Sequence, residues 1–79
     1  MQSPSLWIST YSFVLREEGA VCSAEQLQNH AERAWRRHFR ADPALIARAH
    51  ATLALAFGSG SIGSVELSRL TDEMGAEPA

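Results

Sequence analysis

The sequence predicts an all-α fold, a compact three- or four-helix bundle. We expect a single small helical domain over residues 1–79, with residues 75–79 as a flexible tail. Three patterns predict this fold: a capping box that begins a helix at Ser23, an Asp-Pro pair that begins another at Asp42, and a Gly/Ser-rich break at residues 58–63. The apolar share of 46%, with 20% charged residues, is typical of a chain with a folded core.

The N-terminal segment, residues 6–15, has two interpretations. Ser3 and Pro4 are typical of a helix cap and first turn, and four apolar side chains follow at helical spacing: Trp7, Tyr11, Val14 and Leu15. The same segment is rich in aromatic and β-branched residues, so alternate positions also suit one face of a strand. We favour the helix. The alternative is an α+β fold with residues 6–15 as a β-strand, paired with residues 62–67 or with a second copy.

The clearest helix is predicted over residues 24–40. The side chains of Ser23 and Gln26 have the spacing at which each accepts a hydrogen bond from the other's backbone amide. One face of this helix is apolar or aromatic: Leu27, Ala31, Ala34, Trp35 and His38. The helix ends before Pro43, because the residue that precedes a proline avoids helical geometry.

The next helix is predicted over residues 43–57, with Asp42 as its N-cap. It is apolar on nearly all sides, and such a helix is either central in a bundle or shared with another chain. One side carries Leu45, Ile46, Ala49, Leu53, Ala56 and Phe57, and the opposite side carries Ala47, Ala51, Ala54 and Leu55. We predict that Ala47, Ala51 and Leu55 form a helix interface for a protein partner or for a second copy in a homodimer. Complete burial within a four-helix monomer is the alternative.

A shorter helix is predicted over residues 65–74. Ser64 is placed to cap its N-terminus and Gly75 its C-terminus. Its apolar residues recur in helical register: Leu67, Leu70 and Met74.

The most distinctive surface is an arginine face on the predicted helix 24–40. It consists of Arg33, Arg36, Arg37 and Arg40, which fall within an arc of about 100° when the sequence is projected at helical pitch. Guanidinium groups match carboxylate and phosphate oxygens in pairs, so this face predicts a binding site for an anionic partner. The alternative is a solvated face that is neutralised within the chain. The acids placed to do so are Glu17, Glu18, Glu32, Glu66 and Asp72.

Enzyme and cofactor readings are disfavoured by context. Gly58, Gly60 and Gly63 spell a G-x-G-x-x-G motif, but it follows a predicted helix and not a strand, so we interpret it as a loop. The metal-ligating residue types match no compact zinc spacing: Cys22, His30, His38 and His50. No nucleophile motif is present. We predict no enzyme activity, no metal and no cofactor, and we expect histidines that are satisfied within the core.

These observations favour a protein that acts through contacts. The single cysteine fits a reducing compartment, and the most apolar stretch, residues 44–57, is too short to span a membrane. We expect a cytoplasmic protein-protein interaction module that acts as an adaptor, regulator or inhibitor of a larger protein complex. Its size and character favour a phage or mobile-element accessory factor. The alternative is a nucleic-acid-binding module that places its arginine face on phosphates, although the net charge of -2 implies no general affinity for nucleic acid.

Overall fold

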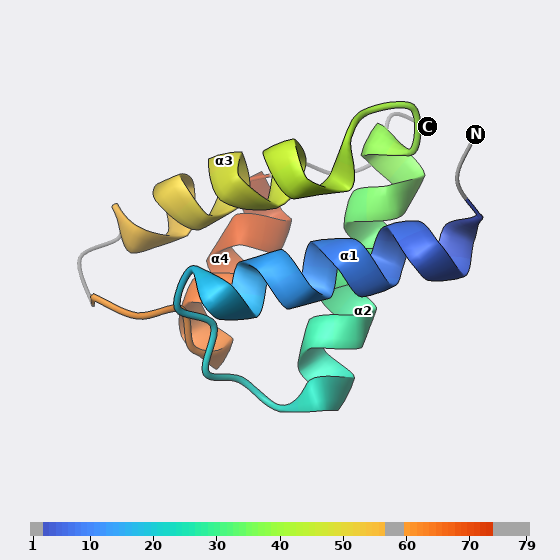
Figure 1. Ribbon diagram of the computed structural model, residues 1–79. Coiled ribbons are helices and arrows are strands. Elements are labelled where there is room, and N and C mark those ends of the chain that lie inside the picture. The colour runs from blue at the N-terminus through green and yellow to red at the C-terminus, as the bar shows by residue number, and fades with distance from the viewer. Residues whose placement is uncertain (1–2, 57–59, 74–79) are drawn as a thin grey trace.

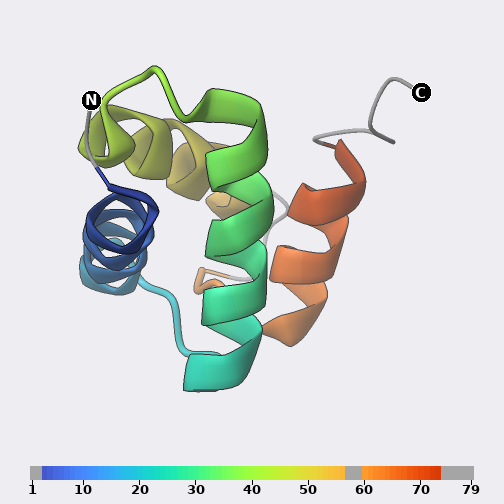
Figure 2. The same cartoon turned by 90° about the vertical axis from the view of Figure 1, so that its right-hand side faces the viewer.

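The computed structural model describes residues 3–56 and 60–73, and these residues form four helices. The helices are α1 (Pro4–Glu17), α2 (Ala24–His38), α3 (Pro43–Leu55) and α4 (Ser64–Glu73). They make two layers: α1 and α3 lie side by side, and α2 and α4 lie against them and cross their direction (Figures 1 and 2). The predicted all-α bundle is confirmed. The alternative strand at residues 6–15 is wrong, because these residues lie within α1.

Local capping fixes where the first three helices begin. The hydroxyl oxygen of Ser3 accepts a hydrogen bond from the α1 backbone at 3.2 Å. Both arms of the predicted capping box at Ser23 and Gln26 are present at the start of α2. The carboxylate of Asp42 accepts from the amide of Ala44 at 2.9 Å at the start of α3. Each cap satisfies an amide that has no partner within its own helix, so these boundaries follow from the local sequence.

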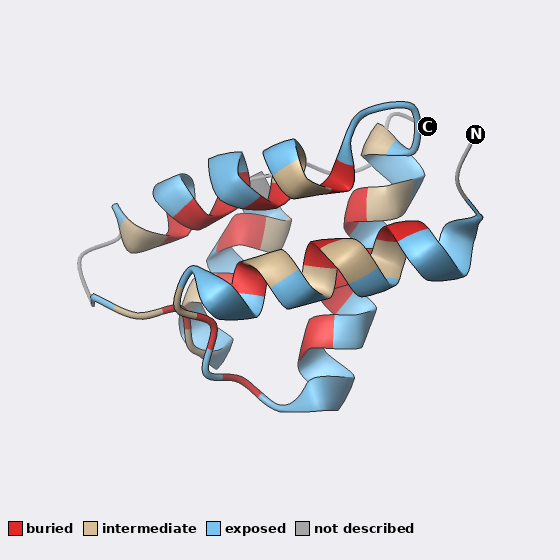
Figure 3. Cartoon of the chain, in the orientation of Figure 1, coloured by how far each residue is buried: buried red, intermediate tan, exposed pale blue. Residues whose placement is uncertain are grey.

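The core is built from large side chains on α1 that pack against small ones on α2 and α3. Trp7, Tyr11 and Leu15 recur every four residues and are almost fully buried. The rings of Trp7 and Tyr11 stack with centroids 5.4 Å apart. Alanines face them: Ala31 and Ala34 on α2, and Ala47, Ala51 and Ala54 on α3. Figure 3 shows these buried positions along the inner sides of the helices. Small side chains let the helix backbones approach closely, which leaves room for the aromatic rings of α1.

This packing corrects one of the predicted interfaces. Ala47 and Ala51 have no exposed surface and belong to the core of the chain itself, and Leu55 is half-buried against that core. The prediction that Ala47 and Ala51 face a partner is therefore wrong, because α1 already covers that side of α3. The exposed apolar side chains of α3 lie on its other side, at Leu45 and Leu53.

The start of α4 also differs from the prediction. The helix begins at Ser64 itself, and the carboxylate of Glu66 accepts from the amide of Gly63 at 2.9 Å. The hydroxyl of Ser64 instead donates to the side chain of Gln26 and so connects α4 to α2. The segment before α4 is held by a parallel bridge between Ala20 and Ile62. Predictions at Phe57, Gly58, Met74, Gly75 and residues 75–79 lie outside the described residues.

None of the helices in the described parts of the chain has the length and apolar character needed to cross a membrane.

Candidate functional site

The structure places all four predicted arginines on the exposed side of α2. Arg33, Arg36 and Arg37 lie within the helix, whereas Arg40 lies just beyond it because α2 ends at His38. Arg36 and Arg37 lie three and four positions after Arg33, and Arg40 lies three and four positions after these two, so the side chains are close neighbours on this surface. All four side chains are exposed. The arginine face predicted from the sequence is therefore present as a surface, and it keeps that name below.

The arginine face is not neutralised by the rest of the described chain. Within residues 3–56 and 60–73, none of its four guanidinium groups makes an ion pair with a carboxylate. Glu32 has the right spacing to pair with Arg36, but its carboxylate accepts from the side-chain amide of Gln28 at 3.1 Å. Among the described residues, the acids considered as neutralising partners therefore make no ion pair with the arginine face. Part of the charge stabilises the C-terminal end of α2, where cations interact favourably with the helix dipole.

One edge of the arginine face is aromatic. The rings of Trp35 and Phe39 lie with centroids 6.0 Å apart, and Phe39 is 38% exposed. The guanidinium carbon of Arg40 lies 5.5 Å from the centre of the Phe39 ring, a cation-π arrangement. The edge therefore offers a charged group and an apolar surface side by side.

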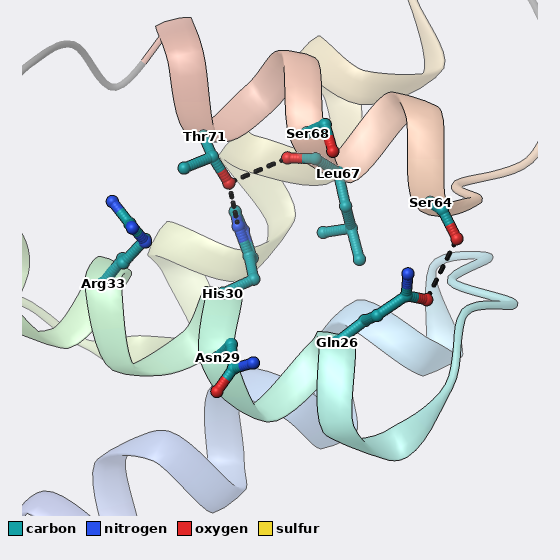
Figure 4. Close-up of a pocket in the computed structure, with 8 residues that line it drawn as sticks. All are labelled: Gln26, Asn29, His30, Arg33, Ser64, Leu67, Ser68 and Thr71. Carbon is teal, nitrogen blue, oxygen red and sulfur yellow. Dashed lines mark hydrogen bonds between the residues drawn. The ribbon is translucent and has the colours of Figure 1, made fainter.

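A pocket of about 170 Å³ opens between α2 and α4 beside the arginine face (Figure 4). Arg33 belongs to the arginine face and also to the pocket, because its side chain lies at one end of the pocket. The lining residues come from the two helices and are mostly polar: Gln26, Asn29, His30, Arg33, Ser64, Leu67, Ser68 and Thr71. This pocket has no counterpart in the sequence patterns, because it depends on how α4 packs against α2.

His30 at the floor of the pocket belongs to a buried chain of hydrogen bonds. Its Nδ1 lies 3.1 Å from Oγ1 of Thr71, and its Nε2 lies 2.8 Å from the hydroxyl of Tyr11. The same hydroxyl lies 2.7 Å from Nδ1 of His50. The chain therefore joins α4, α2, α1 and α3 through four side chains.

The direction of each hydrogen bond in this chain follows from its end at Thr71. The hydroxyl of Thr71 donates to the carbonyl of Leu67 at 2.9 Å, so its oxygen accepts from Nδ1–H of His30. A neutral imidazole has only one N–H, so Nε2 of His30 accepts from the hydroxyl of Tyr11. The Tyr11 oxygen then accepts from Nδ1–H of His50. These hydrogen bonds require a neutral His30, because its Nε2 must accept, and a proton on Nδ1 of His50.

Burial favours the neutral forms of both His30 and His50. It lowers the pKa of His30 to about 4, with smaller contributions from the nearby His50 and from the charge of Arg33. Burial, together with His38, lowers the pKa of His50 to about 4. Burial also raises the pKa of Tyr11 far above its ordinary value, so the phenol stays protonated. The group is a structural network and not a nucleophile, because its hydroxyl is both undissociated and fully hydrogen-bonded.

The sequence prediction of satisfied core histidines holds for His30 and His50, but the apolar stripe indicated His38, which is only half-buried. The sequence did contain a pattern that indicates burial of His30 and His50. His30 and His50 each lie three residues after a buried apolar residue, Leu27 and Ala47, and so share the core face of their helices. Among the described residues, no three His, Cys, Asp or Glu side chains are grouped so that they can hold a metal.

Comparisons with protein-family models, with curated proteins and with solved structures find no significant match to this chain.

Proposed function

We propose that this chain is a protein-interaction module that binds an acidic surface of a partner protein through the arginine face. In this role it acts as an adaptor, regulator or inhibitor of a larger protein complex. The observation that carries the proposal is the set of four exposed arginines that have no carboxylate partner within residues 3–56 and 60–73.

Unpaired arginines on one helix face carry a cost that an anionic partner removes. Like charges three or four positions apart destabilise a helix by about 0.2–0.5 kcal/mol per pair. A bound carboxylate converts that repulsion into charge-assisted hydrogen bonds, and arginine forms these bonds two at a time. The face is therefore better suited to a bound state than to the free chain.

An acidic protein fits the chain better than a nucleic acid does. The net charge is -2, so the molecule as a whole repels a polyanion while the arginine face attracts only locally. The face extends over seven residue steps, about 10 Å along the helix, which suits a compact acidic patch more than a long phosphate backbone. α4 is not a second basic helix that could add to the binding of phosphates, because it carries Glu66 and Asp72 as well as Arg69.

A nucleic-acid-binding module is the second candidate, and the aromatic edge favours it. Exposed aromatic rings beside arginines are the groups on which unpaired bases stack. Phe39, with Arg40 lying over its ring, provides one such position.

Equilibrium binding of two labelled ligands separates these candidates. One is a glutamate- and aspartate-rich peptide, and the other is a DNA oligonucleotide of equal charge, each followed by fluorescence anisotropy at several salt concentrations. We expect tighter binding of the acidic peptide, and loss of that binding when Arg36 and Arg37 are both changed to Glu. Tighter binding of DNA, with affinity falling steeply as salt rises, would support the second candidate instead.

A further inference from the structure

We propose that the pocket between α2 and α4 is a receptor for one carboxylate side chain, with Arg33 as its cationic group. The inference rests on the proposed function, because the carboxylate is a Glu or Asp side chain of the acidic partner that covers the arginine face. It assigns a defined site to one contact within that broad surface.

The polar groups that remain available in the pocket are mainly hydrogen-bond donors. The side-chain oxygen of Gln26 accepts from the hydroxyl of Ser64 at 2.9 Å and from the amide of Ser23 at 3.3 Å. Its two amide hydrogens are therefore left to donate, and Figure 4 shows the amide nitrogen turned away from Ser64. The guanidinium of Arg33 adds further donors and a full positive charge.

The polar side chains at the floor of the pocket, His30 and Thr71, already make hydrogen bonds within the protein. Nδ1–H of His30 donates to Thr71, whose own hydroxyl donates to the carbonyl of Leu67 (Figure 4). These groups are held in place by those hydrogen bonds. A rigid floor with donors around it lowers the entropic cost of binding a small group.

Charge and size both fit a carboxylate. None of the described residues that line the pocket is an Asp or Glu, so an anion meets no like charge from them. The pocket volume of about 170 Å³ exceeds the roughly 150 Å³ cavity that admits benzene, and a Glu or Asp side chain has fewer heavy atoms than benzene. Arg33 lies on the arginine face as well as at the pocket, so a segment bound along α2 reaches the pocket with a single side chain.

A titration with a blocked amino acid tests the site directly. The probe is N-acetyl-glutamate methylamide, its neutral isostere is N-acetyl-glutamine methylamide, and the readout is the NMR shift of the side-chain amides of Gln26 and Asn29. We expect a saturable shift with the glutamate compound and an affinity at least ten-fold weaker for the glutamine compound. No saturable shift, equal binding of both compounds, or stronger binding of inorganic phosphate would overturn the proposal.

Variants separate the pocket from the arginine face. Ser68→Leu fills the pocket from an exposed position of α4, and Ser68→Ala is its matched control. We expect Ser68→Leu to weaken the glutamate compound at least ten-fold, whereas Ser68→Ala and the Arg36→Glu/Arg37→Glu variant retain the pocket shift. If only the arginine variant weakens the acidic peptide and Ser68→Leu changes neither ligand, the pocket proposal fails while the proposed function stands. If the pocket binds glutamate but the arginine variant binds the acidic peptide normally, the proposed function fails instead.

Discussion

The hydroxyl of Tyr11 lies 2.7 Å from Nδ1 of His50 and joins α1 to α3 inside the core. The bond connects residues 39 positions apart in a chain of 79. Because the hydroxyl also donates to His30, it is the central member of the buried hydrogen-bond chain. A buried polar network of this kind stabilises the fold only while all of its members are satisfied.

Replacing Tyr11 with Phe tests the network. The change keeps the ring but leaves Nε2 of His30 without a donor and Nδ1–H of His50 without an acceptor. Each unsatisfied buried group costs about 1–3 kcal/mol, so we expect the free energy of unfolding in urea to fall by about 2–4 kcal/mol. Ser9→Ala, at an exposed position of the same helix, is the control and is expected to change it by less than about 0.5 kcal/mol. Equal stability of Tyr11→Phe and wild type would contradict the network.

Acid is expected to destabilise the protein through His30 and His50. Their pKa values of about 4 lie below the ordinary value of 6.5, so the unfolded chain binds more protons between pH 6.5 and 4. Stability is therefore full above pH 6.5 and falls as the pH drops through this window. We expect a loss of about 3 kcal/mol from His30, at about 1.4 kcal/mol per pKa unit, and less from the more exposed His50.

Urea denaturation at pH 7.0 and pH 4.5 measures this loss. A His50→Gln variant is expected to lose part of the pH dependence. His38→Gln is the comparison variant. His38 is half-buried and outside the hydrogen-bond chain, but burial lowers its pKa and its charge lowers that of His50, so this variant is expected to lose a smaller part of the pH dependence than His50→Gln. Stability that is independent of pH over this range would show that the two histidines are not held neutral by the fold.

Leu53 and Leu55 test which side of α3 faces the core. Leu55 is half-buried against the core and Leu53 is 53% exposed. Leu55→Asp is therefore expected to lower the free energy of unfolding by about 2–3 kcal/mol, and Leu53→Asp by less than about 1 kcal/mol. Thermal or urea denaturation compares the two, and light scattering reports whether either change alters the solution mass. Greater destabilisation by Leu53→Asp would reverse the assignment of the two sides.

Sequence patterns predicted the features that depend on residues close together in the sequence. The helix starts near Ser23 and Asp42 were predictable because a cap bonds to amides two or three positions away. The arginine face was predictable because helical spacing alone places its residues together. By contrast, both sides of α3 are apolar, and only the packing of α1 decides that Ala47 and Ala51 are buried. The pocket at Arg33 escaped prediction for the same reason, since it needs side chains from α4.

We expect that the arginine face is not required for folding. Changing Arg36 and Arg37 to Glu relieves repulsion with the remaining arginines but places negative charge at the C-terminal end of α2. These two effects oppose one another, so we expect the melting temperature to change little, by an amount equivalent to less than about 1 kcal/mol. A large decrease, measured by circular dichroism, would mean that these side chains have structural partners.

The most direct test of the proposed function compares two double variants of equal charge. Arg36→Glu/Arg37→Glu changes the arginine face, and Arg16→Glu/Arg48→Glu changes two exposed arginines on α1 and α3. We measure the affinity of each for the same acidic peptide by fluorescence anisotropy. If the arginine face binds the partner, Arg36→Glu/Arg37→Glu lowers the affinity for the acidic peptide at least ten-fold. Arg16→Glu/Arg48→Glu then lowers it by less. Equal losses in the two variants would contradict the account, because they would show that the peptide responds to net charge and not to this surface.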